Sequence, residues 1–177
     1  TQCEQNLLFA LDGVPAAERL TQVFGAVTDA ERKLMKLSVF FGLEVAQGED
    51  GEEPADYLVR NIIGSDPARG LLAVGGALYP QQRVRLHVRD AATSAEDLRR
   101  RIAELPRPAG ALMFSCLGRG EGLYGQPDHD TAMLRARFPE LPVGGFFCNG
   151  EIGPVGGETF LHGFTSSIAL LRPASTD

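Results

Sequence analysis

Three strand-length segments follow one another closely in the middle of the chain, and their spacing constrains the fold more than any other feature. They cover residues 57–63, 71–74 and 83–90. The first two are joined by a turn at 65–70 in which Pro and Gly are placed to reverse the chain. A parallel crossover needs a dozen or more residues, and these connections are shorter. The three segments therefore predict a largely antiparallel sheet.

Other segments have the apolar pattern of strands, and four have the pattern of helices. Further strands are expected at 7–11, 38–46, 110–116, 141–148, 159–161 and 164–171. Helices are expected after Pro15, after Thr28, after Thr93 and over 128–138, with Glu31 and Glu96 three residues beyond the two Thr caps. Together they predict an α+β fold: a single domain over residues 1–177, with a mostly antiparallel (mixed) sheet and about four helices packed on it.

Charged segments are interpreted as solvated surface in preference to cation or anion sites. Residues 47–53 are acidic and lack apolar side chains, which is typical of a solvated loop. The strand at 83–90 has a basic face that includes His87, and such a face is usually the wet side of a half-buried antiparallel strand. The basic run at 99–101 lies partly around the third helix, where a solvated face is again expected.

Bulk composition excludes several classes of protein. A net charge of −6 does not supply the basic surface on which nucleic-acid binding depends. No apolar run approaches the ~18–20 residues that a membrane span requires. Three cysteines, Cys3, Cys116 and Cys148, cannot all pair internally, so reduced thiols in a cytoplasmic protein are expected. A strand pattern begins at Leu7, soon after Thr1, so the chain is expected to be a piece of a longer protein.

Two buried strands end in glycine-rich polar loops, at 116–122 and 148–157. Glycine permits positive φ and lets backbone amides approach a ligand closely. Loops held by a rigid sheet are where binding residues concentrate. The predicted ligand-binding residues are Cys116, Gly118, Arg119, Asn149, Gly150, Glu151, His162 and Thr165.

These loops and their flanking strands resemble the C-terminal domain of the FIST family. The matching stretches are 114–119 (FSCLGR), 143–154 (VGGFFCNGEIGP) and 161–165 (LHGFT), and weaker agreement extends the resemblance to about 7–171. The family is a sensory domain of bacterial signal-transduction proteins and of certain F-box proteins. The resemblance implies a module that binds small ligands, such as amino acids or other small carboxylates, and relays occupancy to a downstream signalling protein or fused domain. It also implies that the family's N-terminal FIST half, a further partner, is absent from this chain.

Ligand sensing assigns a role to each loop. Arg119 lies between two glycines and would anchor a carboxylate through bidentate hydrogen bonds. Glu151 and Asn149 would suit an ammonium group and its polar neighbours. The alternative for Arg119 and Glu151 is a mutual salt bridge that pins the two loops together.

Three other functions fit the same residues. Cys116 as nucleophile, His162 as base and Glu151 as orienter would form a Cys-dependent hydrolase or transferase, but a Cys at the buried end of a strand is more often a small hydrophobe. No enzymatic activity is therefore predicted. A metal site formed by Cys116, Cys148 and His162 lacks paired ligand spacing, so neither metal nor cofactor is expected.

The last alternative is a protein-interaction module in which the loops are structural. A pocket between the loops, lined by Arg119, Asn149, Glu151 and His162, would favour sensing. Loops packed shut against each other would favour the interaction role.

Overall fold

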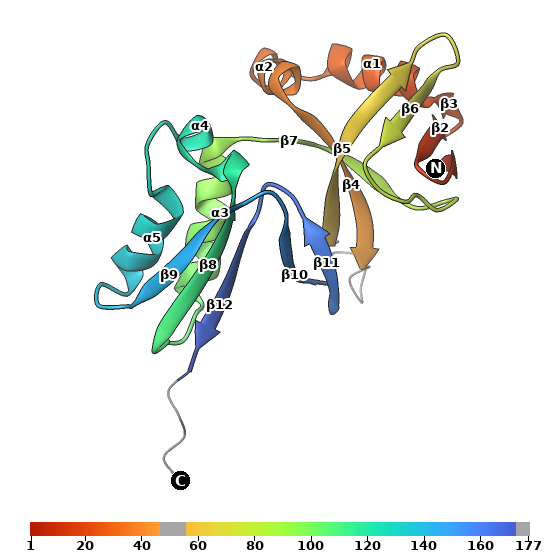
Figure 1. Cartoon of the computed structure of the whole chain (residues 1–177). Coiled ribbons are helices and arrows are strands. Elements are labelled where there is room, and N and C mark those ends of the chain that lie inside the picture. The colour runs from red at the N-terminus through yellow and green to blue at the C-terminus, as the bar shows by residue number, and fades with distance from the viewer. Residues whose placement is uncertain (47–55, 173–177) are drawn as a thin grey trace. The chain divides into compact units, whose positions relative to one another are not determined.

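The computed structural model describes residues 1–46 and 56–172 (Figure 1). The acidic segment predicted to be a solvated loop, 47–53, lies outside the described residues. The chain divides into two compact units. The first contains Thr1–Arg89 and Val155–Glu158, and the second contains Asp90–Pro154 and the chain from Thr159 onward. Each unit is described on its own.

The first unit contains a seven-stranded sheet with two helices. Its strands are β1 (Gln2–Glu4), β2 (Leu7–Leu11), β3 (Val14–Pro15), β4 (Val39–Ala46), β5 (Asp56–Asp66), β6 (Leu71–Val74) and β7 (Val84–Val88). The order is β1-β2-β6-β5-β4-β7, with β3 paired to β2, and every pairing is antiparallel. Helix α1 (Ala16–Ala26) contacts β2 and β6, and α2 (Asp29–Leu37) contacts β4 and β7. Of the three closely spaced strands, β5 and β6 pair with each other and β7 pairs with β4, so all three lie in the predicted antiparallel sheet.

Local signals in this unit act as the sequence indicated. Thr28 caps α2 in a full capping box: its hydroxyl accepts from the Glu31 amide, and the Glu31 carboxylate accepts from the Thr28 amide. The turn between β5 and β6 closes with the Gly70 amide donating to the Pro67 carbonyl at 3.3 Å, and Gly70 has a positive φ of 69°. The strand face that includes His87 is less exposed to solvent at His87 than predicted. His87 is half-buried against Tyr57, and burial lowers its pKa.

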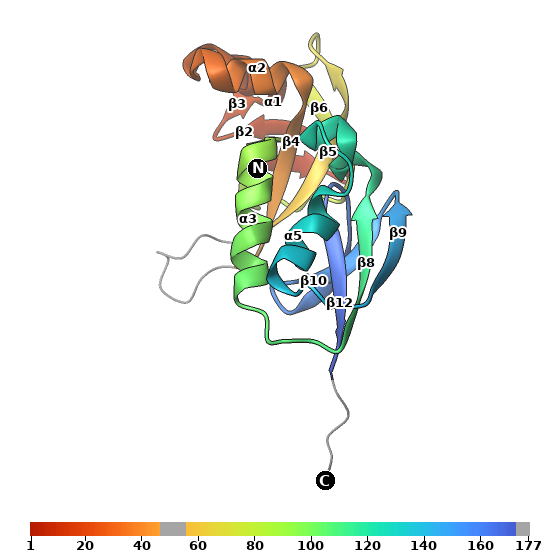
Figure 2. The same cartoon turned by 90° about the vertical axis from the view of Figure 1, so that its left-hand side faces the viewer.

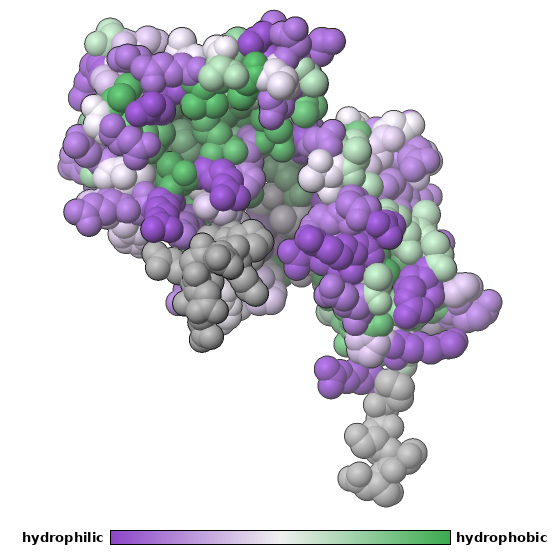
Figure 3. All heavy atoms as spheres, turned by 180° about the vertical axis from the view of Figure 1, so that it is seen from behind, coloured by the Kyte–Doolittle hydropathy of each residue, from purple (hydrophilic) through white to green (hydrophobic). Residues whose placement is uncertain are grey.

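The first unit also presents apolar side chains at its surface. Figure 3 shows them gathered in a patch surrounded by hydrophilic side chains. The large apolar side chains most exposed in this unit are Leu37, Ile63 and Tyr79. Strand residues Leu8, Phe41 and Leu72 are among the buried side chains of this unit.

The second unit is built on a three-stranded sheet. Its elements are α3 (Ala91–Ala103), β8 (Gly110–Cys116), the 3₁₀ turn η1 (Leu117–Arg119), α4 (Glu121–Tyr124), α5 (His129–Arg137), β9 (Val143–Cys148), β10 (Glu151–Val155), β11 (Glu158–His162) and β12 (Ser166–Leu171). The sheet order is β12-β8-β9, with β12 antiparallel and β9 parallel to β8. The described residues therefore confirm the predicted α+β class with a mostly antiparallel, mixed strand arrangement.

Helices α3 and α5 cover one face of this sheet (Figure 2). Leu98 and Ile102 of α3 pack with Met113 of β8 and Leu134 of α5 in one buried cluster. The parallel connection from β8 to β9 passes through α5, so the N-terminus of α5 lies toward the carboxyl ends of both strands. This arrangement brings loop and helix termini together at one end of the sheet.

Some boundaries differ from those expected. Helix α3 begins at Ala91, because Asp90 and not Thr93 is its N-cap: the Asp90 carboxylate accepts from the Thr93 amide at 2.7 Å. The polar segment expected to be a loop at 149–157 contains β10. It forms a hairpin with β11 through Gly156 and Gly157, which both have positive φ as a tight two-residue turn requires.

The described residues contain five α-helices, where about four were expected. The short α4 accounts for the difference, since the glycines around it suggested a loop. Whether residues 1–177 behave as one domain stays a prediction.

Candidate functional site

Arg119 is buried at the carboxyl end of β8. Its exposed fraction is 9%, and η1 directs it toward α5. The guanidinium donates from Nε and Nη2 to the two carboxylate oxygens of Asp130, at 2.7 and 3.2 Å, and from Nη1 to the Ser94 hydroxyl at 2.8 Å. These bonds use three of the five N–H groups of arginine, which leaves two able to donate to a bound molecule.

Asp130 is the centre of a hydrogen-bond network in the first turn of α5. Besides the bonds from Arg119, its Oδ2 accepts from the Ser115 and Ser166 hydroxyls at 3.1 and 2.7 Å, and its Oδ1 accepts from His129 Nδ1 at 3.0 Å. Burial alone would raise its pKa, but the bonds from Arg119, Ser166 and His129 outweigh burial and lower the pKa to about 2. The carboxylate is therefore ionised at neutral pH, and it joins β8, β12 and α5.

His129 is fixed by two neighbours. Its ring stacks on Tyr124, with ring centroids 3.6 Å apart and planes within 9°. Because the ionised Asp130 carboxylate can only accept, Nδ1 carries a proton and donates to it. Nε2 is then the ring atom with remaining capacity for a hydrogen bond.

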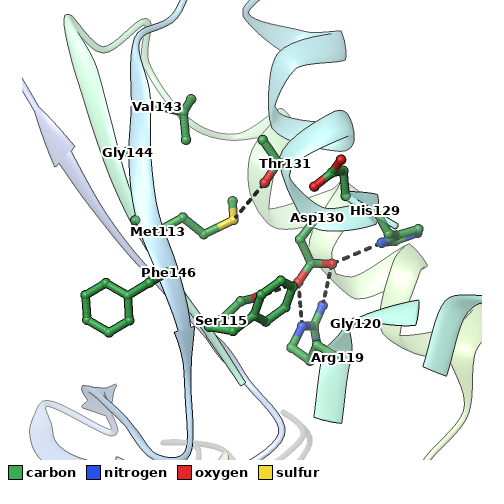
Figure 4. A pocket seen from close by; sticks show the side chains of 13 residues that line it. Met113, Ser115, Arg119, Gly120, His129, Asp130, Thr131, Val143, Gly144 and Phe146 are labelled. Carbon is green, nitrogen blue, oxygen red and sulfur yellow. Dashed lines mark hydrogen bonds and ion pairs between the residues drawn. The ribbon is translucent and has the colours of Figure 1, made fainter. Parts of the chain in front are cut away.

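A cavity of about 220 Å³ lies beside this network (Figure 4). Figure 4 shows Asp130 between Arg119 and His129, with Met113 and Val143 farther along the cavity wall. The cavity combines a charged, hydrogen-bonded end with an apolar wall and lies at the carboxyl end of the parallel strand pair. It is lined by Met113, Ser115, Arg119, Gly120, Asp128, His129, Asp130, Thr131, Val143, Gly144, Gly145, Phe146 and Phe147.

The first turn of α5 contributes backbone donors at this cavity. Its N-cap, Asp128, has a left-handed conformation with φ of 56°, and its side chain forms no capping hydrogen bond. Helix N-termini attract anionic groups through their amides and dipole. The exposed Asp128 carboxylate adds an acceptor at the same place.

Glu151 forms a second buried polar cluster within the same unit. Only 1% of it is exposed. Its Oε1 accepts from Cys148 Sγ at 3.3 Å and from the Gly150 amide at 3.2 Å. Its Oε2 accepts from the Thr165 hydroxyl and amide at 3.1 and 3.4 Å. Partial burial and the bond to this carboxylate raise the pKa of the Cys148 thiol.

The structure separates the predicted ligand-binding residues. Arg119 lines the cavity, with Gly118 beside it in η1, whereas Asn149, Glu151 and His162 do not line it. His162 contacts the Gly153 carbonyl through Nε2 at 2.9 Å. The cavity is thus not the one expected between the two loops.

The predicted alternative of an Arg119–Glu151 salt bridge is wrong, because Arg119 pairs with Asp130. Cys116 is buried, as expected of a small hydrophobe. The Gly150 amide and the Thr165 hydroxyl donate hydrogen bonds to the Glu151 carboxylate. Ligand binding by the predicted residues stays a prediction.

Sequence reasoning missed Asp130, His129, Ser115 and Ser166. The only signal for Asp130 was an acidic residue in the first turn of a helix, which is a common feature with no functional meaning of its own. The serines lie opposite each other on neighbouring strands, β8 and β12, a relation that depends on strand order.

Among residues 1–46 and 56–172, no group of three or more His, Cys, Asp or Glu side chains is placed to hold a metal ion. In the same part of the chain, no helix is long and apolar enough to cross a membrane.

Comparison with known proteins gives a consistent assignment. The model of the FIST C domain family matches residues 16–154. The chain is similar to the uncharacterized protein Rv0628c of Mycobacterium tuberculosis, with 36% identity over 175 residues, covering 96% of this chain and 46% of that protein. It is equally similar to the uncharacterized protein Mb0898c of Mycobacterium bovis, with 36% identity over 175 residues, covering 96% of this chain and 45% of that protein.

A shorter match links the chain to a plant protein. The F-box/LRR-repeat protein At5g63520 of Arabidopsis thaliana is 44% identical over 48 residues, which cover 27% of this chain and 9% of that protein. The chain spans about half the length of the mycobacterial relatives.

Proposed function

The chain belongs to the FIST C domain family, a family of sensory signal-transduction domains, and from that premise we propose that it binds a small carboxylate, such as an amino acid, in the cavity beside Arg119. It acts without catalysis and relays occupancy to a fused or separate signalling partner in the cytoplasm. The N-terminal half of the longer family members is one such partner. The observation on which this rests is the cavity itself, which unites a buried arginine, a helix N-terminus and an apolar wall.

The chemistry of the cavity favours an amino acid over a neutral ligand. A ligand carboxylate can accept from the two remaining N–H groups of Arg119 and from the first-turn amides of α5. An ammonium group can reach the Asp128 carboxylate, which does not cap the helix. The apolar side chain of the ligand would lie against Met113 and Phe147.

The size of the cavity restricts the ligand. Drug-sized molecules occupy pockets of roughly 300–1,000 Å³, and this cavity has about 220 Å³. The proposed ligand is therefore a single small metabolite and not a peptide or nucleotide.

Catalysis is disfavoured by the positions of the candidate groups. Cys116 is only 5% exposed, and His162 directs Nε2 at the Gly153 carbonyl. The Asp130 carboxylate holds both Ser115 and His129, so neither is arranged as a nucleophile with its base.

The test is calorimetric titration of a panel of amino acids, each paired with its amide and its N-acetyl derivative. The amide removes the carboxylate and the acetyl group removes the ammonium charge, so the pairs show which group is recognised. A ligand at 100 times its Kd should also stabilise the fold by about 2.7 kcal/mol. If no member of the panel binds, the proposal of a small carboxylate fails.

Variants locate the bound ligand. Phe147→Ala removes a wall of the cavity and is expected to weaken binding, because the ligand loses its apolar contact. Leu161→Ala is the matched control: its side chain is similarly exposed, at 62% against 51%, but does not line the cavity. Equal affinities of the two variants would place the ligand elsewhere.

An interaction module is the second candidate, favoured by the open face of the three-stranded sheet. Leu112, Phe146 and Leu171 are 42–64% exposed, and strand register places them on one face, away from the α3–α5 core. Co-purification with the remaining part of a longer family member, lost in Leu112→Lys and retained in Leu117→Lys, would support this role. Co-purification that both variants retain would count against it.

A further inference from the structure

Cys116 and Cys148 lie opposite each other at the ends of neighbouring strands. They are the last residues of β8 and β9, and the parallel register pairs them directly. Paired residues on adjacent strands point to the same face of the sheet. Neighbouring strands are about 4.8 Å apart, and a disulfide requires α-carbons roughly 4.4–6.8 Å apart. The backbone therefore already meets the main distance requirement for a disulfide.

The side chain of Cys148 is directed toward the other strand. Its Sγ lies 3.5 Å from the carbonyl oxygen of Ser115, the residue immediately before Cys116. Both thiols are free, Cys148 partly exposed and Cys116 buried. One cysteine can thus meet a solution reagent, and the other is next to it and shielded.

We propose that Cys116 and Cys148 are a reversible dithiol–disulfide pair, whose oxidant is a low-molecular-weight disulfide. Cys148 is the attacking thiol and Cys116 the resolving thiol. The proposal does not depend on what the cavity binds. It assigns a function to the cross-strand cysteine pair, which plays no part in the hydrogen-bond network of Asp130.

The chemistry balances in two exchanges. The Cys148 thiol loses its proton to the Glu151 carboxylate, which accepts its hydrogen bond at 3.3 Å, and from there to water. The thiolate attacks one sulfur of the small disulfide, forms a mixed disulfide and expels one small thiolate. Cys116 then loses its proton to water and attacks Cys148 Sγ, which expels the second. The protein loses two electrons and the oxidant becomes two small thiols.

The environment of Cys148 is expected to make thiol–disulfide exchange slow. The thiolate is the reactive species, and partial burial and Glu151 raise the pKa of this thiol. Disulfide exchange takes seconds to hours, so exposure to the oxidant is followed over several hours. The dithiol form is the resting state.

Closing the disulfide would clamp the strand ends at the cavity. Ser115 and Phe147 directly precede the two cysteines, and both line the cavity from the opposite face of the sheet. Oxidation also removes the thiol donor from Glu151. A covalent link is therefore expected to slow amide hydrogen exchange in β8 and β9.

The test uses the whole chain and oxidised glutathione as the probe. The reduced protein is incubated with it, quenched with an alkylating reagent under denaturing conditions and analysed by peptide mass spectrometry. The expected product links the Cys116 and Cys148 peptides in most molecules, with Cys3 alkylated. Cys3, in the other unit, is the internal control.

Other products would overturn the proposal. If glutathione stays bound to Cys148 while Cys116 is alkylated, Cys116 does not attack the mixed disulfide. Three alkylated cysteines after hours of exposure would mean that the pair is inert. Links to Cys3 would mean that oxidation follows unfolding and not the strand register.

Two variants test the roles of the thiols. Cys116→Ala is expected to trap one glutathione on Cys148, and Cys148→Ala is expected to leave Cys116 unmodified because it is buried. Circular dichroism establishes that each variant is folded. If either variant is unfolded, the peptide map of the unmodified sequence still decides the proposal.

Discussion

The second unit buries two carboxylates, and they are held in different ways. Asp130 is 7% exposed and accepts five hydrogen bonds, two of them from the cation Arg119. Glu151 is 1% exposed and accepts four, all from neutral donors. Within the described residues, no basic side chain forms an ion pair with Glu151.

The difference separates a carboxylate that neutralises a buried cation from one that is held by neutral donors only. Asp130 pairs with Arg119 at the wall of the cavity, where the proposed carboxylate ligand would meet the guanidinium. Glu151 joins the end of β9 to the start of β12 through Cys148 and Thr165 and lies away from the cavity. Ligand binding by Glu151 therefore stays a prediction, since the contacts seen are all with groups of its own unit.

Removing the cation should have the largest effect. Arg119→Met leaves Asp130 buried without its partner, which typically costs about 3–5 kcal/mol. Urea titration followed by circular dichroism measures the loss. Arg135→Met, an exposed change on α5, the helix that carries Asp130, should stay within about 0.5 kcal/mol. If Arg119→Met lowers the free energy of unfolding no more than Arg135→Met does, the Arg119–Asp130 ion pair does not stabilise the fold as proposed.

Acid should weaken the Asp130 network by a somewhat smaller amount. Its pKa falls from roughly 3.9 in an unfolded chain to about 2 in the folded protein. A group with a lowered folded pKa stabilises the fold above its unfolded pKa, and this stability is lost as pH falls through the folded pKa. Roughly 2–3 kcal/mol should therefore disappear progressively between about pH 5 and 1. Urea titrations across this range should show that Asp130→Asn lacks this component. An identical acid profile would contradict it.

Glu151→Gln should cost about 1–3 kcal/mol, because the new amide turns a donor toward groups that also donate. Urea titration against Glu158→Gln, an exposed position on β11, isolates the buried effect. A loss larger than that of Arg119→Met would reverse the proposed distinction between the two carboxylates.

Thr165→Val should have the smallest effect. It removes one hydroxyl bond to Glu151 Oε2 and keeps the shape of the side chain, so about 0.5–1.5 kcal/mol is expected. Thr159→Val, at an exposed position, is the control in the same urea titration. An unchanged midpoint in Thr165→Val would mean that the backbone amide alone holds this side of Glu151.

Much of the fold followed from local patterns. Alternation and apolar runs located every strand from β2 onward except β3 and β10, and the Thr28 capping box placed the start of α2. Very short strands such as β3 were not predicted, because two residues are too few to show the alternating pattern of a strand. Strand β10 was predicted to be a loop, because its segment is rich in glycine and its pairing with β11 is not visible in the sequence.

The sequence alone determined the α+β class and the family, because both depend on residues that are near one another along the chain. Only the tertiary structure decided which carboxylate Arg119 meets. Asp130 and Glu151 are both acidic residues in polar surroundings, and no local pattern separates them. The crossover through α5 brings Asp130 to β8, while the hairpin after β9 places Glu151 beside Cys148 and Thr165. The choice is set by strand order, which a linear sequence does not display.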